Sequence, residues 1–208
     1  MNLTSKRESL KKLYYPLGES LARAGFPPNF ITLISLFLGS VSAYFYFHHK
    51  VLSGALFLAL SGLFDLLDGV VARTTGKTTR FGAVFDWISD KWVDGFVLGA
   101  VGFAFASPFV AITAITLSML HSFIKPVAYA EIGYADRQKG KIIDPLEGVG
   151  FFGRPETHIT LILFSILERF HFPLGLGFGI KLIAFLTLIS LIMRILYLYR
   201  KYGKEYED

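Results

Sequence analysis

Long apolar segments alternate with short polar and basic ones along this chain, and that pattern predicts its main elements. Several of the apolar segments approach or exceed the roughly 18 residues that a helix needs to cross a bilayer. They cover residues 30–47, 51–71, 82–106, 108–130, 157–170 and 176–198. The fifth segment is short, so its helix is expected to tilt little or to begin earlier. We therefore predict an all-α integral membrane protein with six transmembrane helices.

A different pattern precedes the first span. Between Glu8 and Ala24, apolar residues recur at helical spacing among charged ones and form one stripe: Leu10, Leu13, Tyr14, Leu17 and Leu21. The stripe predicts an N-terminal amphipathic interfacial helix, with a plain soluble arm as the alternative. Pro27-Pro28-Asn29 then breaks the chain. We expect a single membrane domain, with the interfacial helix and entry in residues 1–28, a six-span core in 29–198 and a tail in 199–208.

Composition supports a membrane protein and excludes several kinds of chemistry. The chain is 53% hydrophobic and has a mean hydropathy of +0.51. It contains no cysteine, which excludes disulfides, thiolate catalysis and Cys-ligated metals. No cleavable signal peptide is visible, because residues 1–12 are polar and basic with no apolar core behind them. The net charge of +5 indicates contact with anionic lipid headgroups and not with nucleic acid, because the basic residues cluster at span ends.

The distribution of these basic residues predicts the orientation in the membrane. They concentrate in the N-terminal segment, the connection after the second span, the loop after the fourth span and the C-terminus, and the intervening loops are poorer in charge. The loop after the fourth span contains Arg137, Lys139, Lys141 and Arg154. Because positive loops stay in the cytoplasm, both termini and the loops after spans two and four are expected there. We expect the plasma membrane as the location.

Four aspartates interrupt the second and third spans. Asp65 and Asp68 lie three residues apart, and Asp86 and Asp90 lie four apart, so each pair shares one helix face. A carboxylate at membrane depth costs roughly 2.5–3.5 kcal/mol on insertion scales, so four of them indicate a functional site. The short connection 74–81 predicts that the two helices are antiparallel neighbours and that all four carboxylates converge.

Four carboxylates without His or Cys favour Mg²⁺, Mn²⁺ or Ca²⁺ over zinc, and they can hold one or two ions that clamp a phosphate or diphosphate. The residues between the pairs suit such a substrate. Gly69 and Ala72 are small, Arg73 offers a guanidinium to phosphate oxygens, and Gly82 permits close approach. Asp90 is the candidate general base for an attacking hydroxyl.

Other interpretations account for part of this pattern. Helix caps or ion pairs, such as Asp86 with Lys91 or Arg80, explain one or two aspartates but not four on facing helices. A divalent-cation transporter explains intramembrane carboxylates on physical grounds, but it gives no role to Gly69, Ala72 and Arg73. A non-catalytic lipid-binding scaffold is a third alternative, against which the intact Asp90 argues.

The chain resembles the CDP-alcohol phosphotransferases, whose signature is D-x2-D-G-x2-A-R-x8-G-x3-D-x3-D. The matching residues are Asp65, Asp68, Gly69, Ala72, Arg73, Gly82, Asp86 and Asp90. Pro28-Asn29 and Thr32 also resemble the family's P-N-x-x-T entry to the first span. The resemblance implies transfer of a phosphoalcohol group from a CDP-alcohol, such as a CDP-lipid, to an acceptor hydroxyl with release of CMP. It also implies one or two Mg²⁺ or Mn²⁺ ions, a homodimer and a role in phospholipid biosynthesis.

The resemblance also implies roles for single residues. Asp90 would be the catalytic base. The metal ligands would be Asp65, Asp68 and Asp86, joined by Asp90 for a second ion. The residues at the CDP moiety would be Asn29, Thr32, Asp68, Gly69, Ala72, Arg73 and Gly82.

The acceptor is expected to meet basic residues near the cytoplasmic face, with Lys125 and Arg154 as candidates, although positive-inside charge alone also explains them. The segment from Gly153 to Glu156 is similar to the R-x-E-R segment of inositol-phosphate-using members, but Thr157 stands at its second basic position. We therefore expect inositol phosphate as the acceptor, with glycerol phosphate or another small polar alcohol as alternatives.

Overall fold

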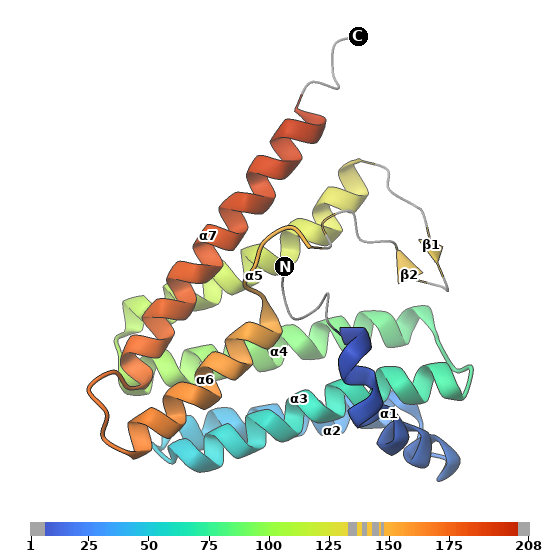
Figure 1. Ribbon diagram of the computed structural model, residues 1–208, viewed down its shortest axis with the longest axis horizontal. Helices are drawn as coiled ribbons and strands as arrows, with labels where there is room; N and C mark the ends of the chain where they lie inside the picture. Colours follow the sequence, from blue (N-terminus) through green and yellow to red (C-terminus); the bar gives the residue numbers. More distant parts are fainter. Residues whose placement is uncertain (1–6, 133–136, 139–140, 143–145, 147, 204–208) are drawn as a thin grey trace.

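The computed structural model describes residues 7–132, 137–138, 141–142, 146 and 148–203, and the described chain is helical apart from one short β-ribbon (Figure 1). The helices are α1 (Arg7–Arg23), α2 (Pro28–Phe47), α3 (Val51–Thr74), α4 (Arg80–Phe105), α5 (Pro108–Glu131), α6 (Arg154–Arg169) and α7 (Leu176–Tyr202). The ribbon consists of β1 (Arg137–Gln138) and β2 (Lys141–Ile142), which pair antiparallel between α5 and α6. The basic loop predicted after the fourth span falls here, and Lys139 lies outside the described residues.

Each predicted span corresponds to one helix, so the all-helical architecture is confirmed. Four helices, α2, α3, α5 and α7, are long and apolar enough to cross a membrane. The other two differ for clear reasons: α4 has 26 residues but carries five charged side chains in its first 15, and α6 has only 16 residues. The fifth segment does begin earlier than residue 157, at Arg154, after the N-cap residue Gly153. That all six cross the bilayer stays a prediction.

The N-terminal helix α1 forms as expected and packs against α3. Tyr14 is buried in a small apolar cluster with Leu67 and Val70 of α3. Gly18 faces the same helix so closely that a Cβ built on it would lie 2.5 Å from Cγ1 of Val70. The absence of a side chain at Gly18 therefore lets α1 rest on α3, directly behind the turn that carries Asp68 and Gly69.

Helix α2 packs against both α3 and α4 and fixes their positions. A Cβ on Gly39 would lie 2.4 Å from Cγ2 of Val93 on α4 and 3.0 Å from Oγ of Ser61 on α3. Ser35 and Ser61 also donate reciprocally, each hydroxyl bonding the other residue's carbonyl oxygen at 2.8 Å. Small residues and hydroxyl pairs of this kind bring membrane helices close together.

Helices α3 and α4 run antiparallel, as predicted (Figure 1), but their backbones are not closely packed along each other. Both pack on α2; α3 also packs on α6, and α4 on α5 and α7. The carboxylate-bearing sides of α3 and α4 therefore face each other without closing into a helix interface. We call the space between them the gap. Side chains from α6 enter this gap.

Candidate functional site

Three of the four predicted carboxylates meet across the gap. Asp65 of α3 and Asp86 and Asp90 of α4 each offer a carboxylate oxygen, and these oxygens all lie within 4.8 Å of one another. The three side chains are half-buried. A set of hard oxygen ligands at this separation fits one divalent cation such as Mg²⁺ or Mn²⁺.

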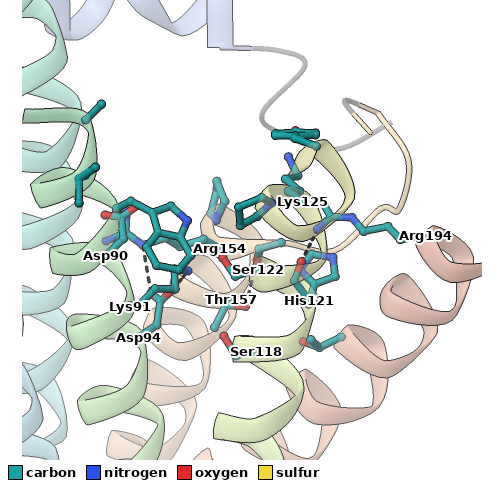
Figure 2. Close-up of a pocket in the computed structure, with 18 of the residues that line it drawn as sticks. Asp90, Lys91, Asp94, Ser118, His121, Ser122, Lys125, Arg154, Thr157 and Arg194 are labelled. Atoms are coloured by element: carbon teal, nitrogen blue, oxygen red, sulfur yellow. Dashed lines mark hydrogen bonds and ion pairs between the residues drawn. The ribbon is translucent and has the colours of Figure 1, made fainter. Parts of the chain in front are cut away.

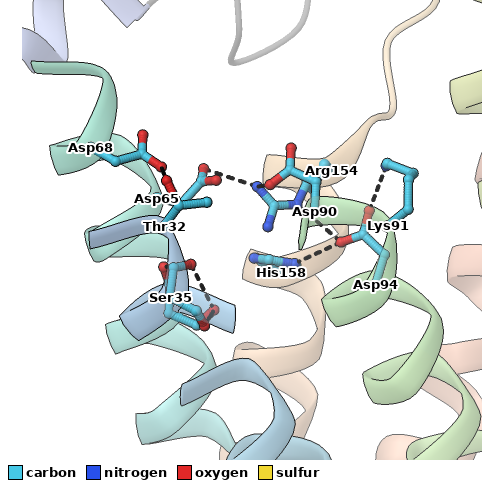
Figure 3. Close-up of polar contacts among 10 residues, drawn as sticks. Thr32, Ser35, Asp65, Asp68, Asp90, Lys91, Asp94, Arg154 and His158 are labelled. Atoms are coloured by element: carbon cyan, nitrogen blue, oxygen red, sulfur yellow. Dashed lines mark hydrogen bonds and ion pairs between the residues drawn. The ribbon is translucent and has the colours of Figure 1, made fainter. Parts of the chain in front are cut away.

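Asp68 lies beside this group and is held by α2. Its Oδ2 accepts a hydrogen bond of 2.7 Å from Oγ1 of Thr32, and the residue is only 5% exposed (Figure 3). The structure thus joins two predicted site residues, Thr32 and Asp68, although Asp68 is not one of the three converging carboxylates. Its role as a metal ligand stays a prediction.

The other predicted nucleotide contacts also come together at this end of α2, α3 and α4. A Cβ on Gly82 would lie 3.1 Å from Oδ1 of Asn29, so the amide of Asn29 reaches the first turn of α4. A Cβ on Gly69 would lie 3.2 Å from Nη1 of Arg73, so this guanidinium lies over the glycine. Ala72 is half-buried and Arg73 is exposed. Contact of these residues with CDP stays a prediction.

Arg154, predicted to bind the acceptor, lies among the carboxylates. It begins α6, and its Nη1 is 2.9 Å from Oδ2 of Asp65 and 2.8 Å from Oδ1 of Asp90. Its Nε donates to Oδ1 of Asp94 at 3.0 Å (Figure 3). Among the described residues its buried Nη2 has no hydrogen-bond partner. One side chain therefore connects α6 to both carboxylate-bearing helices.

Asp94 is a site residue that the sequence analysis missed. Its side chain is 4% exposed and contacts three potential cations: Lys91 at 2.8 Å, Arg154 at 3.0 Å and His158 at 3.3 Å. The ion-pair alternative pairs Lys91 with Asp86, whereas the structure shows Lys91 in an ion pair with Asp94. A carboxylate this deeply buried is stable only when such partners surround it.

The signal for Asp94 was present in the sequence. Asp86, Asp90 and Asp94 follow one another at intervals of four, so all three lie on one face of α4. The family signature ends at Asp90, so the signature alone gives Asp94 no role.

A cavity of about 650 Å³ opens beside the carboxylates, between α4, α5, α6 and α7 (Figure 2). Asp90 and Asp94 line it, and so do the predicted acceptor residues Lys125 and Arg154. Further lining residues that the sequence analysis did not assign are Lys91, Ser118, His121, Ser122, Thr187 and Arg194. The cavity therefore presents several basic and hydroxyl-bearing side chains within a largely apolar lining, and it borders the candidate base.

Arg194 shows how the wall of this cavity is held together. It is 5% exposed, and its guanidinium donates to the carbonyl oxygens of Val149 at 3.1 Å and of His121. His121 in turn bonds Ser190 through Nε2 at 3.0 Å. These bonds connect α5, α7 and the segment before α6, so the wall opposite Asp90 is a fixed structure.

A family model described as CDP-alcohol phosphatidyltransferase matches residues 26–202. The chain belongs to the CDP-alcohol phosphatidyltransferase family. It is 27% identical over 194 residues to the archaetidylinositol phosphate synthase of Pyrococcus horikoshii, covering 93% of this chain and 94% of that protein. It is 32% identical over 183 residues to the phosphatidylinositol phosphate synthase of Mycobacteroides abscessus, covering 84% of this chain and 74% of that one.

Solved structures agree with this membership. The crystal structure of Mycobacterium tuberculosis phosphatidylinositol phosphate synthase with CDP-DAG bound aligns with a TM-score of 0.73 at 27% identity, covering 90% of this chain and 94% of that chain. The same enzyme in complex with manganese and citrate aligns with a TM-score of 0.73, covering 90% and 89%. The chain is thus a membrane transferase of phospholipid biosynthesis. Membership of this enzyme family favours catalysis over the transporter and scaffold alternatives.

Proposed function

We propose that this transferase moves the phospholipid group of a CDP-lipid to a hydroxyl of inositol phosphate and releases CMP. One observation carries the proposal: Asp90 belongs to the converging carboxylates and also lines the cationic cavity. A base at that position stands between a diphosphate donor and a phosphorylated acceptor. The relatives' names support both the CDP-linked donor and the inositol phosphate acceptor.

The carboxylate group fits a divalent cation, since its three oxygens come from both sides of the gap and all are hard ligands. We infer that Asp65, Asp86 and Asp90 hold Mg²⁺ or Mn²⁺ and that Asp68 completes the set of ligands. When bound, such an ion would neutralise the diphosphate and polarise its phosphorus. A relative's structure with manganese supports this assignment.

The donor's CDP moiety is assigned to the end of the gap where α2, α3 and α4 meet. Gly69, Ala72 and Gly82 leave room for it there, and the exposed guanidinium of Arg73 can donate to phosphate oxygens. Asn29 reaches the same place from α2. The lipid chains then extend into the bilayer.

The cavity is assigned to the acceptor. Lys125 and Arg154 offer positive charge to its phosphate, and the hydroxyls of Ser118, Ser122 and Thr187 suit a polyol. Asp90 takes the proton of the attacking hydroxyl as its oxygen bonds to phosphorus. The bond from phosphorus to the CMP oxygen breaks in the same displacement, and CMP leaves as an anion.

The wider setting belongs to the same proposal. The whole chain is one catalytic domain with six spans, α1 lies at the interface, and the gap opens to the cytoplasm as the basic loops predict. The enzyme is expected to act as a homodimer.

CMP release by the purified protein tests this function. In nanodiscs with Mn²⁺ and CDP-diacylglycerol or its archaeal ether counterpart, we expect release with inositol 1-phosphate and little with glycerol 3-phosphate or free inositol. Preference for glycerol 3-phosphate would replace the acceptor assignment. If no CMP were released with any acceptor and either donor, the transfer reaction would be refuted.

A further inference from the structure

Asp94 stands outside the family signature and takes part in no step of the reaction above, yet its carboxylate contacts three potential cations. Its Oδ2 accepts from Lys91, and its Oδ1 accepts from Arg154 and contacts His158 (Figure 3). Removing a carboxylate from water to this degree has a large desolvation penalty, which the three partners offset. Such an arrangement indicates that Asp94 has a role in positioning the basic side chains of the site.

The backbones of α4 and α6 are not packed along each other, so long side chains make the connection between them. Arg154 provides most of it, and a free arginine side chain samples many rotamers. Asp94 binds Nε, while Nη1 faces Asp65 and Asp90. Contacts at two different nitrogens fix the plane of the guanidinium, and a contact at one nitrogen would leave it free to turn.

Asp94 also contacts Arg154 from a different side than the other carboxylates do. Asp65 and Asp90 attract the Nη1 end of the guanidinium towards the gap, whereas Asp94 binds its Nε at the cavity wall. Lys91 lines the same cavity and is held by the same carboxylate. One buried anion therefore sets the positions of two cations on the acceptor side of Asp90.

We propose that Asp94 is a positioning residue for phosphate recognition: it holds Arg154 and Lys91 so that a phosphorylated acceptor meets preformed cations next to Asp90. The inference rests on the proposed transfer reaction. It assigns to Asp94 no contact with substrate, and its effect on the acceptor passes through the two basic side chains.

Substitution of Asp94 by Asn is the direct test, because it keeps the size and removes the charge. The KM for inositol 1-phosphate should rise about 10- to 100-fold, by analogy with other supporting residues at active sites, while the KM for CDP-lipid stays within about twofold. Asp94→Glu, which retains the charge, should restore part of the acceptor affinity. A purely structural role would change both KM values together, in step with the loss of thermal stability.

Ser89→Ala is the matched control. Ser89 lies on the same helix, is also 5% exposed, and its buried Oγ has no hydrogen-bond partner among the described residues. This variant should keep both KM values. If Asp94→Asn does not fold, Asp94→Glu alone must still raise the acceptor KM, because the longer side chain moves Arg154.

The outcomes separate the two levels of the argument. An active wild type whose acceptor KM is unchanged in Asp94→Asn and in Asp94→Glu overturns the positioning role and leaves the transfer reaction standing. A wild type that releases no CMP with any acceptor overturns the transfer reaction and the positioning role with it. Equal rises in the acceptor and donor KM values also overturn the positioning role.

Discussion

The interface between α2 and α3 and the gap between α3 and α4 use opposite means to hold helices in place. At the interface, Ser35 and Ser61 exchange short hydrogen bonds with each other's backbone. Gly39 of α2 has no side chain that would push against Ser61 of α3 or, more closely, against Val93 of α4. Across the gap, charged side chains from α6 reach between backbones that are not packed together.

This difference separates two parts of the molecule. We call the closely packed helices α2, α3 and α4, with contacts such as those of Ser35, Gly39 and Ser61, the frame, and we call the charged residues at the gap the site. Neutral hydroxyls bonded to backbone satisfy themselves locally and need no ligand. Carboxylates and guanidinium groups facing a gap carry charge that a phosphate or a divalent ion can engage. Thr32 lies at the boundary, since its hydroxyl belongs to the α2 frame and its acceptor is Asp68 of the site.

The largest effect is expected on the gap side, from Asp90→Asn. Loss of the base should lower kcat about 10²- to 10⁴-fold, because the acceptor hydroxyl keeps its proton. Binding of CDP-lipid, measured by isothermal titration in nanodiscs, should be largely retained. Arg154 keeps Asp65 and Asp94 as partners, so the fold should persist. Simultaneous loss of CDP-lipid binding would show that Asp90 acts chiefly as a metal ligand and would contradict its role as the base.

A smaller effect is expected at the boundary, from Thr32→Val. The change removes the 2.7 Å hydrogen bond that orients Asp68 and keeps the shape of the side chain. Mn²⁺ affinity, measured by electron paramagnetic resonance, should fall about 10-fold, as for other residues that orient metal ligands.

Thr113→Val is the control for this prediction. Among the described residues, the Thr113 hydroxyl bonds only the carbonyl of Phe109 in its own helix, on an exposed face. It should leave Mn²⁺ affinity unchanged. Unchanged affinity in Thr32→Val would place Asp68 outside the metal site.

The frame was predictable from the sequence to a large extent, and its success has a physical reason. Apolar length predicts a helix wherever the chain must satisfy its backbone in a bilayer, and the Pro27-Pro28 step marks the start of α2. The motif spacing likewise predicts which carboxylates share a face, and Asp65, Asp86 and Asp90 do converge.

The rest depended on contacts between distant segments, which periodicity does not encode. A short loop between α3 and α4 predicts antiparallel direction but not how closely the two helices pack. Arg154 lies 60 residues or more from each of its three acidic partners, and a basic residue beside a loop has the same pattern whether it serves topology or catalysis. Asp94 has the pattern of a residue within a span because two of its three partners, Arg154 and His158, come from α6.

Within the frame, Gly39→Ala should have the larger effect on stability. The new methyl group would lie 2.4 Å from Cγ2 of Val93, a buried β-branched residue with little freedom to turn. Separation of α2 from α4 should cost about 1–3 kcal/mol, read as a lower thermal unfolding midpoint. Gly62→Ala is the control, since its nearest neighbour would be Nδ1 of His158 at 3.6 Å. Equal midpoints for the two variants would contradict close packing as the basis of the frame.

The smallest effect is expected from Ser35→Ala at the interface of α2 and α3. The variant loses the bond from Oγ of Ser35 to the carbonyl of Ser61. The reverse bond, which Oγ of Ser61 donates to the Ser35 carbonyl, remains because its acceptor at residue 35 is a backbone atom. Hydrogen bonds between membrane helices contribute about 0.6 kcal/mol on average, so the unfolding midpoint should move little. A double-mutant cycle with Ser61→Ala measures how far the two bonds depend on each other. If Ser35→Ala destabilised the protein as much as Gly39→Ala, hydroxyl pairing and not close backbone packing would hold the frame together. The frame and the gap would then both depend on polar contacts and would differ only in whether those contacts are neutral or charged.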